Sequence, residues 1–303
     1  MTKRLFIFAS YDKFQRVDDT LIYYLNALSQ LGDIVFYMDN DLQNNEIDKI
    51  KSIPNVLYAR AKRHGEYDFG SYKRGYIWTR DNNLLSDYDW VYLVNDSVLG
   101  PIAPLEPIIK KLEKSDADFV GMVCCTAPDL PHHLQSWFIG LNADIAKSDI
   151  FNNFITDISH EYDKATIVYK YEIRLTQMLL QNGYKHTTVF NDSDANIYNN
   201  SVKFLESGVP FIKKLSLYNT KIISLYPFIS RNFAKLLIDY IHNYNVNFDK
   251  TDILDTAYSK SFRFTIFGLP LVSAKQKKIR NDIAYKIYLF DTIPIFKLFL
   301  TKS

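Results

Sequence analysis

Three polar residues follow an apolar run in the sequence VYLVNDSVLGP, between residues 91 and 101. Asn95, Asp96 and Ser97 come directly after four apolar residues and shortly before a Gly-Pro pair. A capped turn is one interpretation, because small polar residues are favoured in turns. The other is a ligand site, because a carboxylate at the end of a buried strand can hold a divalent cation or accept a hydrogen bond from a sugar hydroxyl. The buried character of the preceding run favours the ligand site.

A second group of polar residues lies just upstream, in the sequence EYDFGSYKRGYIWTRDN. Asp68 and Gly70 precede a predicted helix whose first turn contains Ser71 and which also contains Lys73 and Arg74. A helix N-terminus beside a glycine and cations is a natural phosphate site. An ordinary N-cap with solvated basic residues is the alternative. Because one helix joins this group to the polar residues after Val94, we favour a shared site.

A third group lies in HHLQSWFIGL, which alternates like a β-strand. Successive side chains of a strand point to opposite faces, so His133, Gln135 and Trp137 share one face. His133 and Gln135 could bind sugar hydroxyls, and Trp137 could stack on a sugar ring. A hydrogen-bonded histidine and a core tryptophan remain equally open.

Strands and helices alternate over the first 125 residues and must position these groups. Helical patterns separate the short apolar runs, and this alternation predicts an open α/β sheet, whose ligands bind at the carboxyl ends of its strands. The predicted strands are RLFIFA, DIVFYM, NVLYAR, DWVYLV and DFVGMV, and the predicted helices are DDTLIYYLNALSQLG, SYKRGYIWTRDNNLL and APLEPIIKKLEKS.

The second half predicts one more helix, YEIRLTQMLLQNG, one more strand, KHTTVF, and then a basic helical region from about residue 200. We therefore expect an α/β domain that holds the candidate site over residues 1–215 and a helical C-terminal region over 216–303. No run reaches the ~18 apolar residues that a membrane span needs. The apolar run in MTKRLFIFASYD is shorter than a signal-peptide core and predicts a first strand.

Charge and cysteine content narrow the classes of protein. The net charge of +2 gives no case for nucleic-acid binding. Positive charge is concentrated from Ala274 to Ser303, which hold seven Lys or Arg against two Asp. The two cysteines, Cys124 and Cys125, are adjacent on a predicted strand, so a disulfide is not expected and a reducing cytosol fits. Together with His132 and His133 they lack the ligand spacing of a zinc site.

Several of these blocks, taken in order, resemble a known family. The order DFGSYKRG, VYLVNDSVLGP, DFVGM, HLQSWF, YEIRLT, ESGVPFIKK is similar to that of the rhamnan-synthesis glycosyltransferases. This family of bacterial rhamnosyltransferases builds cell-wall rhamnan and O-antigen chains, and the resemblance covers about residues 60 to 215.

The resemblance implies a GT-A-like (Rossmann-like) fold, an open mixed sheet flanked by helices, here with the helical basic C-terminal extension. In that fold a strand ends in an Asp-x-Asp motif that binds metal and diphosphate. This sequence departs from the motif, because Asn95 and Ser97 replace its carboxylates and only Asp96 could hold Mg²⁺ or Mn²⁺. Lys73 or Arg74 could then neutralise the leaving diphosphate instead. The residues assigned to the donor site are Ser10, Asp68, Gly70, Ser71, Lys73, Arg74, Asn95, Asp96 and Ser97.

The resemblance also implies a catalytic base. Inverting transfer needs one group to take the proton of the acceptor hydroxyl. Related enzymes place a carboxylate at the start of a late helix. Glu172 fits that position, with Asp163 as the reserve, and Asp96 is the second catalytic candidate. His133, Gln135 and Trp137 are assigned to the acceptor.

The implied activity is transfer of L-rhamnose from dTDP-β-L-rhamnose to a growing polysaccharide on a polyprenyl lipid, such as O-antigen, capsule or cell-wall rhamnan. The protein would be cytoplasmic and peripheral on the inner face of the membrane. One alternative is a different nucleotide sugar, because nothing in the sequence recognises the methyl group of rhamnose. Another is a catalytically silent subunit that binds glycan or nucleotide. The basic tail would either bind anionic membrane or pack on the domain.

Overall fold

The structure, a computed structural model, describes residues 2–193, 201–218, 222–244 and 246, and four strands between residues 261 and 300. The chain forms two compact units. The first comprises residues 1–220 and 226–245, and the second comprises residues 221–225 and 246–303. All the candidate site residues belong to the first unit.

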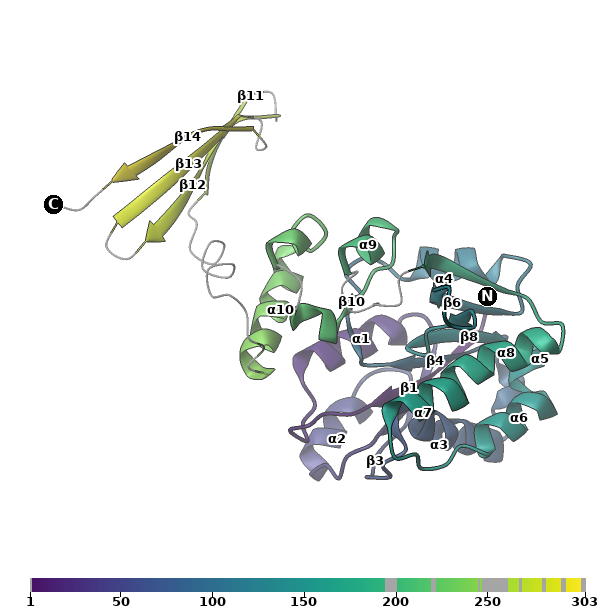
Figure 1. The fold of residues 1–303 in the computed structure, drawn as a ribbon. Coiled ribbons are helices and arrows are strands. Elements are labelled where there is room, and N and C mark those ends of the chain that lie inside the picture. The colour runs from purple at the N-terminus through teal and green to yellow at the C-terminus, as the bar shows by residue number, and fades with distance from the viewer. Residues whose placement is uncertain are drawn as a thin grey trace. The chain divides into compact units, whose positions relative to one another are not determined.

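An eight-stranded mixed sheet forms the centre of the first unit (Figure 1). The strand order is β3-β2-β1-β4-β8-β6-β7, and β9 pairs with β6. Strands β1 to β4 pair in parallel, β8 runs antiparallel to β4 and β6, and β9 is parallel to β6. The strands are β1 (Arg4–Ser10), β2 (Asp33–Met38), β3 (Val56–Ala61), β4 (Trp90–Asn95), β6 (Phe119–Cys125), β7 (His133–Leu134), β8 (Phe138–Asn142) and β9 (His186–Asp192).

Helices cover both faces of this sheet (Figure 1). One face carries α1 (Asp19–Ser29), α2 (Asn44–Lys51), α4 (Glu106–Glu113) and α9 (Ser201–Glu206). The other carries α3 (Tyr67–Asp81), α5 (Ala143–Ala146), α6 (Asp149–Thr156), α7 (Lys164–Ile167), a π-helical turn (Val168–Ile173) and α8 (Arg174–Gln181).

The apolar core has two halves because neighbouring residues of each buried strand point to opposite faces. In β1, Phe6 and Phe8 pack in the layer of α1, whereas Leu5 and Ile7 pack in the layer of α3. Helix α3 lies close against the sheet at Gly75, where an added Cβ would come within 2.5 Å of Ile7 Cγ2. The N-terminal turn of α3 is thereby fixed beside the carboxyl ends of the parallel strands.

A short antiparallel pair continues from the tip of β4. Strand β5 (Val98–Leu99) pairs with β10 (Ile212–Lys213), with Lys213 opposite Val98. The backbone N–H of Lys214 also donates to the carbonyl of Ser97 at 3.0 Å. A segment more than a hundred residues downstream is thus held over the polar residues that follow β4.

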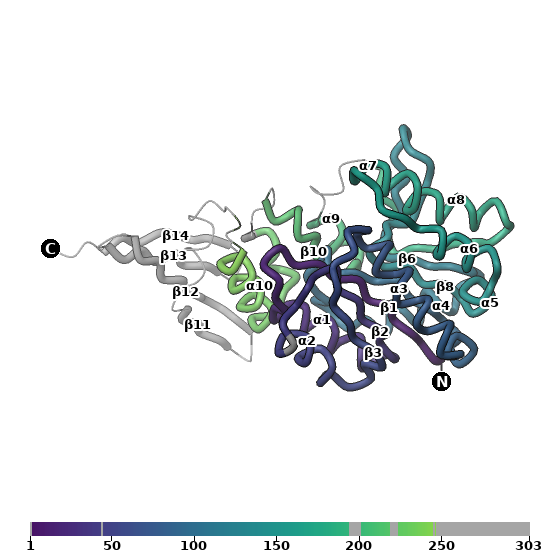
Figure 2. The backbone as a smooth tube through the Cα atoms, turned by 90° about the horizontal axis from the view of Figure 1, so that it is seen from below, coloured from purple at the N-terminus to yellow at the C-terminus, as the bar shows by residue number. Residues whose placement is uncertain are grey.

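Helix α10 (Arg231–Tyr244) packs beside α1 (Figures 1 and 2). The ring centroids of Phe233 and Tyr23 lie 5.6 Å apart. The hydroxyl of Tyr244 donates hydrogen bonds to Asp12 and to Asp18, the N-cap of α1. The first unit therefore extends beyond its last sheet strand through α10.

The predicted open mixed sheet flanked by helices is confirmed. The two cysteines are buried and unpaired. Within the described ranges, no helix is long and apolar enough to cross a membrane.

The predicted helical tail is wrong for much of residues 261–300. These residues form an antiparallel sheet of β11 (Ser261–Ile266), β12 (Leu269–Ile279), β13 (Asp282–Leu289) and β14 (Ile293–Leu300). The segment DIAYKIYL alternates apolar residues with period two and is rich in β-branched and aromatic residues, both of which favour strands. Of the predicted helical region, α10 is helical.

Candidate active site

The three polar residues at the end of β4, Asn95, Asp96 and Ser97, point in different directions. The amide Nδ2 of Asn95 donates to Asp68 Oδ2 at 3.0 Å, and its Oδ1 accepts from the backbone N–H of Ser97 at 3.0 Å. The carboxylate of Asp96 instead accepts from Ser10 Oγ at 2.8 Å and lies 3.6 Å from Lys214 Nζ. Burial raises the pKa of Asp96, although Lys214 and the Ser10 hydroxyl oppose that shift.

The β5–β10 pair brings two lysines to this tip. Lys213 is 8% exposed; its Nζ donates to Ser97 Oγ at 3.3 Å and lies 5.2 Å from the centroid of the Trp137 ring. Burial lowers the pKa of Lys213 to about 8, although Glu172 and Asp68 raise it. Lys214 pairs with Asp96 and lies over the ring of Tyr240 at 5.3 Å.

Asp68 lies in the first turn of α3, where the helix dipole favours a carboxylate. Burial nevertheless raises the pKa of Asp68 to about 7, and the negative charge of Asp96 adds to the shift. The sequence placed Asp68 and Gly70 before this helix, but α3 begins at Tyr67 and includes both. The amide of Gly70 donates to the Glu66 carbonyl at 3.1 Å and is therefore occupied.

Glu172 lies in the π-helical turn between α7 and α8. Its Oε2 accepts from the backbone N–H of Ser136 at 2.8 Å and from the Ser136 hydroxyl, and its Oε1 lies 3.7 Å from His133 Nε2. The prediction that Glu172 opens a helix is wrong. Asp163 caps this helical segment instead, because its side chain accepts from the Thr166 N–H at 2.8 Å.

Gln135 and Trp137 hold each other in place. Trp137 Nε1 donates to Gln135 Oε1 at 2.7 Å, which fixes the orientation of the amide because the indole N–H can only donate. Trp137 is 2% exposed, and Lys213 lies over its ring, so its main role is in the core. The Nε2 of Gln135, also buried, has no hydrogen-bond partner in the described part of the protein. This amide N–H₂ is available to a ligand.

A cavity of about 190 Å³ joins these groups. Its lining carries two carboxylates and three ammonium groups, together with amide, hydroxyl and apolar side chains. The lining residues are Asp68, Asn95, Ser97, Gln135, Ser136, Trp137, Lys164, Val168, Glu172, Lys213, Lys214 and Leu215. The carboxylate of Asp96 is not part of this lining.

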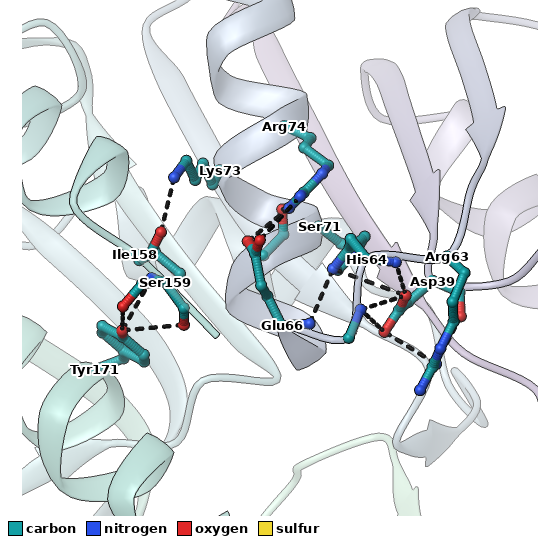
Figure 3. Close-up of polar contacts among 12 residues, drawn as sticks. Asp39, Arg63, His64, Glu66, Ser71, Lys73, Arg74, Ile158, Ser159 and Tyr171 are labelled. Atoms are coloured by element: carbon teal, nitrogen blue, oxygen red, sulfur yellow. Dashed lines mark hydrogen bonds and ion pairs between the residues drawn. The ribbon is translucent and has the colours of Figure 1, made fainter. Parts of the chain in front are cut away.

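The basic residues of α3 are engaged elsewhere (Figure 3). Lys73 Nζ donates to the Ile158 carbonyl at 2.7 Å. Arg74 donates two hydrogen bonds to the carboxylate of Glu66, at 2.7 and 3.0 Å. Neither Lys73 nor Arg74 borders the 190 Å³ cavity.

The loop before α3 is organised by a buried carboxylate at the end of β2. Asp39 accepts from the backbone N–H groups of His64 at 2.6 Å and Gly65 at 3.0 Å, and from Arg63 Nη1 at 3.1 Å (Figure 3). His64 Nδ1 accepts from the Glu66 N–H, so Nε2 carries the proton and donates to Ser71 Oγ at 3.0 Å. Burial, helped by Arg74, lowers the pKa of His64 to about 4.

A larger cavity of about 460 Å³ lies along this loop. Three of its tyrosines, Tyr11, Tyr67 and Tyr162, are 50%, 45% and 96% exposed, and the guanidinium of Arg63 lies 5.2 Å from the Tyr11 ring centroid. Asp68 borders both cavities, so the two adjoin there. The lining residues are Tyr11, Asp39, Arg63, Gly65, Tyr67, Asp68, His160, Glu161 and Tyr162.

The donor set at the tip of β4 does not fit Mg²⁺ or Mn²⁺. Such cations take carboxylate-rich oxygen ligands, whereas Asn95 and Ser97 offer an amide and a hydroxyl and lie beside an ammonium group. The carboxylate of Asp96 pairs with Lys214. Among the described residues, no three His, Cys, Asp or Glu side chains are grouped as a metal site.

The structure divides the predicted site residues into four groups. Ser10 and Asp96 contact each other outside the smaller cavity. The four residues of α3 contact other groups: Ser71 contacts His64, Lys73 contacts the Ile158 carbonyl, Arg74 contacts Glu66, and Gly70 lies against Glu66 and His64. His133 reaches the smaller cavity only through its contact with Glu172. The predicted residues that line that cavity are Asp68, Asn95, Ser97, Gln135, Trp137 and Glu172.

Sequence reasoning missed Lys213, Lys214, Tyr11 and Asp39. The two lysines end ESGVPFIKK, one of the blocks that carry the family resemblance, but the resemblance assigns no role to them. Asp39 follows an apolar run, DIVFYM, in the same way that Asn95 follows VYLV. Both signals were present, but neither specified which side chains would turn toward a cavity.

Comparison with known proteins gives one strong match and several partial ones. The family described as rhamnan synthesis protein F matches residues 34–292. The uncharacterized protein y4gN of Sinorhizobium fredii is 26% identical over 171 residues, which cover 56% of this chain and 44% of that protein. The virulence protein VirA of Vibrio anguillarum is 29% identical over 111 residues, which cover 36% of this chain and 34% of that protein. The chain thus spans less than half the length of these curated relatives.

Two solved structures are distantly similar. Core-mannan synthase A (CmsA/Ktr4) of Aspergillus fumigatus, in an Mn/GDP form, has a TM-score of 0.35 and 9% identity, covering 59% of this chain and 70% of that one. The glycosyltransferase GlyE of Streptococcus pneumoniae TIGR4 has a TM-score of 0.39 and 12% identity, covering 81% of this chain and 64% of that one.

The raised pKa of Asp68 predicts a pH-dependent stability difference. The pKa of about 7 in the folded protein exceeds the value of about 3.9 in an unfolded chain. The folded state therefore binds a proton that the unfolded state lacks, and the stability from this group is lost as pH rises from about 4 to about 7. Because asparagine does not titrate, Asp68→Asn should gain stability relative to wild type across this window.

Urea unfolding at pH 4.5 and pH 7.5 measures this difference. Asp163→Asn is the matched control, because asparagine also caps a helix and the pKa of Asp163 is lowered, chiefly by the backbone N–H of Thr166. Its difference from wild type should not change across the window. An equal difference between Asp68→Asn and wild type at both pH values would mean that Asp68 is ionised in the folded protein throughout.

Proposed function

The chain belongs to the rhamnan synthesis protein F family, and from that premise we propose that it is an inverting glycosyltransferase. The donor is dTDP-β-L-rhamnose, and the acceptor is a hydroxyl of a growing polysaccharide on a polyprenyl lipid. The observation that carries the proposal is the 190 Å³ cavity at the carboxyl edge of the sheet. There a carboxylate, Glu172, shares one small space with Asp68 and with the buried ammonium group of Lys213.

Glu172 is the general base in this proposal. The acceptor oxygen forms a bond to C1 of the donor sugar while the bond from C1 to the β-phosphate oxygen breaks, and the electron pair leaves with that oxygen. The acceptor proton passes to Glu172. Attack from the face opposite the leaving group inverts the configuration at C1.

The neighbours of Glu172 support this role by fixing its orientation. The Ser136 N–H and hydroxyl both donate to Oε2, which leaves Oε1 for the acceptor. His133 Nδ1 lies 2.7 Å from the Pro131 carbonyl, which can only accept, so this nitrogen carries a proton. The other ring nitrogen of His133, Nε2, lies 3.7 Å from Oε1.

The two adjoining cavities suit the two halves of the donor. The exposed tyrosines Tyr11, Tyr67 and Tyr162 provide flat faces for a thymine base in the larger cavity; stacking on an aromatic side chain contributes about 1–3 kcal/mol per base. The sugar occupies the smaller cavity, where the unpartnered Nε2 of Gln135 donates to a sugar hydroxyl. Asp68, which borders both cavities, lies where the nucleotide and sugar halves meet.

A panel of nucleotide sugars tests this function. The purified protein is incubated with dTDP-β-L-rhamnose and with UDP- and GDP-hexoses, and release of nucleoside diphosphate is measured. The proposal predicts release from dTDP-β-L-rhamnose above all others. Release from another donor would change the donor sugar of the proposal and leave glycosyl transfer as the reaction. Tight binding of a nucleotide without release from any donor would favour the catalytically silent subunit.

Glu172→Gln tests the assignment of the base. Glutamine keeps the shape and the hydrogen bonds from Ser136 but cannot take a proton, so turnover should fall about 10²- to 10⁴-fold. Binding of dTDP, measured by calorimetry, should be little changed. The matched control is Asp163→Asn, whose exposed side chain borders neither cavity and should leave turnover near normal. Normal turnover in Glu172→Gln with loss in Asp163→Asn would transfer the role to Asp163.

The basic C-terminal segment would hold the enzyme near its lipid-linked acceptor. Residues 274–303 carry seven Lys or Arg against two Asp, and each cation adds roughly 1 kcal/mol near an anionic surface. Full-length protein should therefore sediment with liposomes containing anionic lipid at low salt and be released at high salt. Protein that stays in the supernatant at low salt would refute membrane association.

A further inference from the structure

The most unusual charge near the smaller cavity is the ammonium group of Lys213. It is 8% exposed, and its neighbours are the Ser97 hydroxyl and the face of Trp137. Within the described part of the chain, no carboxylate lies within ion-pair distance of it. A buried charge without a counter-ion is costly, so proteins rarely keep one without a use. An anionic ligand in the cavity would supply the missing partner.

The backbone fixes this ammonium group over the tip of β4. Lys213 pairs with Val98 in the β5–β10 ribbon, and the Lys214 N–H donates to the Ser97 carbonyl at 3.0 Å. The adjacent Lys214 is different, because it already pairs with Asp96. Lys213 therefore offers a positioned positive charge that Glu172 and Asp68 stabilise only from beyond ion-pair distance, whereas Lys214 pairs directly with Asp96.

Departure of a nucleoside diphosphate requires positive charge beside the β-phosphate. Breaking the bond to C1 leaves an additional negative charge on the departing oxygen, which preorganised donors or cations stabilise. The tip of β4 does not provide the carboxylate ligands that a divalent cation prefers. Lys73 and Arg74, the cations expected from the sequence, donate hydrogen bonds to the Ile158 carbonyl and to the Glu66 carboxylate (Figure 3).

We propose that Lys213, together with the Ser97 hydroxyl, binds the diphosphate of the donor and neutralises the leaving group in place of a divalent cation. This inference rests on the proposed function and assigns a residue to its diphosphate. The ammonium group donates hydrogen bonds to a β-phosphate oxygen and transfers no proton. The electron pair of the broken bond stays on the departing oxygen, and the acceptor proton goes to Glu172.

Binding of dTDP and of thymidine in the presence of EDTA tests the inference. Charge-assisted hydrogen bonds are strong, so Lys213→Met should weaken dTDP binding about 10- to 100-fold and leave thymidine binding unchanged. Lys213→Arg should retain much of the dTDP affinity. Lys203→Met, a change at an exposed lysine of α9, is the matched control and should leave both affinities unchanged.

Turnover without added metal provides the second measurement. Wild-type protein should release dTDP at the same rate with EDTA as with Mg²⁺, and Lys213→Met should lose about 10²- to 10³-fold in kcat. Thymidine binding by Lys213→Met reports that the variant is folded, and Lys213→Gln is a second variant should it not be. Unchanged dTDP affinity in folded Lys213→Met would overturn the inference, as would dTDP binding that needs a divalent cation.

The outcomes separate this inference from the proposed function. Wild-type protein that binds neither dTDP nor thymidine would contradict the proposed donor. Wild-type protein that transfers rhamnose, with Lys213→Met equally active, would keep the function and remove Lys213 from it.

The pH dependence of binding gives an independent signature. Asp68 from α3, Glu172 from the π-helical turn and Lys164 from α7 are the charged groups that act on Lys213. The pKa of Lys213 is about 8 in the free protein, so its charge is lost as pH rises above that value. Affinity for dTDP should therefore fall above about pH 8 while affinity for thymidine stays level. A flat profile for dTDP up to pH 9.5 would contradict a role for this ammonium group.

Discussion

The cost of burying charge at the carboxyl end of β4 is the constraint on which the candidate site depends. An isolated ion in a protein interior is strongly unfavourable unless a nearby group compensates it. Asp96 is compensated by Ser10 from β1 and by Lys214 from the segment after β10. Asp68 accepts a hydrogen bond from Asn95. Each compensation joins parts of the chain that are distant in sequence, so the charges also fix the walls of the cavity.

The same cost of burying charge applies to the ammonium group of Lys213. Lys213 has a hydroxyl and an aromatic ring as neighbours, which only partly replace the water that an ammonium group loses on burial. Its lowered pKa is the expected consequence of burial. A bound diphosphate would supply the opposite charge, and this links the structure of the cavity to the proposed chemistry of glycosyl transfer. Positive charge supplied by the chain would also explain why Asn95 and Ser97, and not two further carboxylates, flank Asp96.

The sequence predicts the fold well where one local signal dominates. The buried strand DIVFYM corresponds to β2 (Asp33–Met38). The helical pattern DDTLIYYLNALSQLG corresponds to α1, whose N-cap Asp18 accepts a hydrogen bond from the Leu21 N–H. Local signals fail where two are in competition. Residues 282–289 lie in a basic region that suggested a surface helix, but they carry apolar residues at every second position, and this alternation, which indicates a strand, prevails.

The site was harder to predict because its geometry depends on contacts between distant residues. The block DFGSYKRG correctly marks a helix N-terminus, but the sequence could not show that Glu66 would engage Arg74 or that the Ile158 carbonyl would engage Lys73. The orientation of Asp96 depends on the bend that follows β4, where Asn95 and Ser97 line the cavity and Asp96 contacts Ser10 of β1. Lys213 enters the site only through the pairing of β10 with β5.

A crystal structure of the protein with dTDP, grown in the presence of EDTA, would test the central claim most directly. We expect the thymine ring in the cavity lined by Tyr11 and Tyr67, and a β-phosphate oxygen within about 3.2 Å of Lys213 Nζ. Glu172 should face the space beyond that phosphate, where the sugar would lie. A diphosphate bound at the N-terminus of α3 against Lys73 and Arg74, or bound only when a divalent cation is supplied at Asn95 and Ser97, would contradict the account.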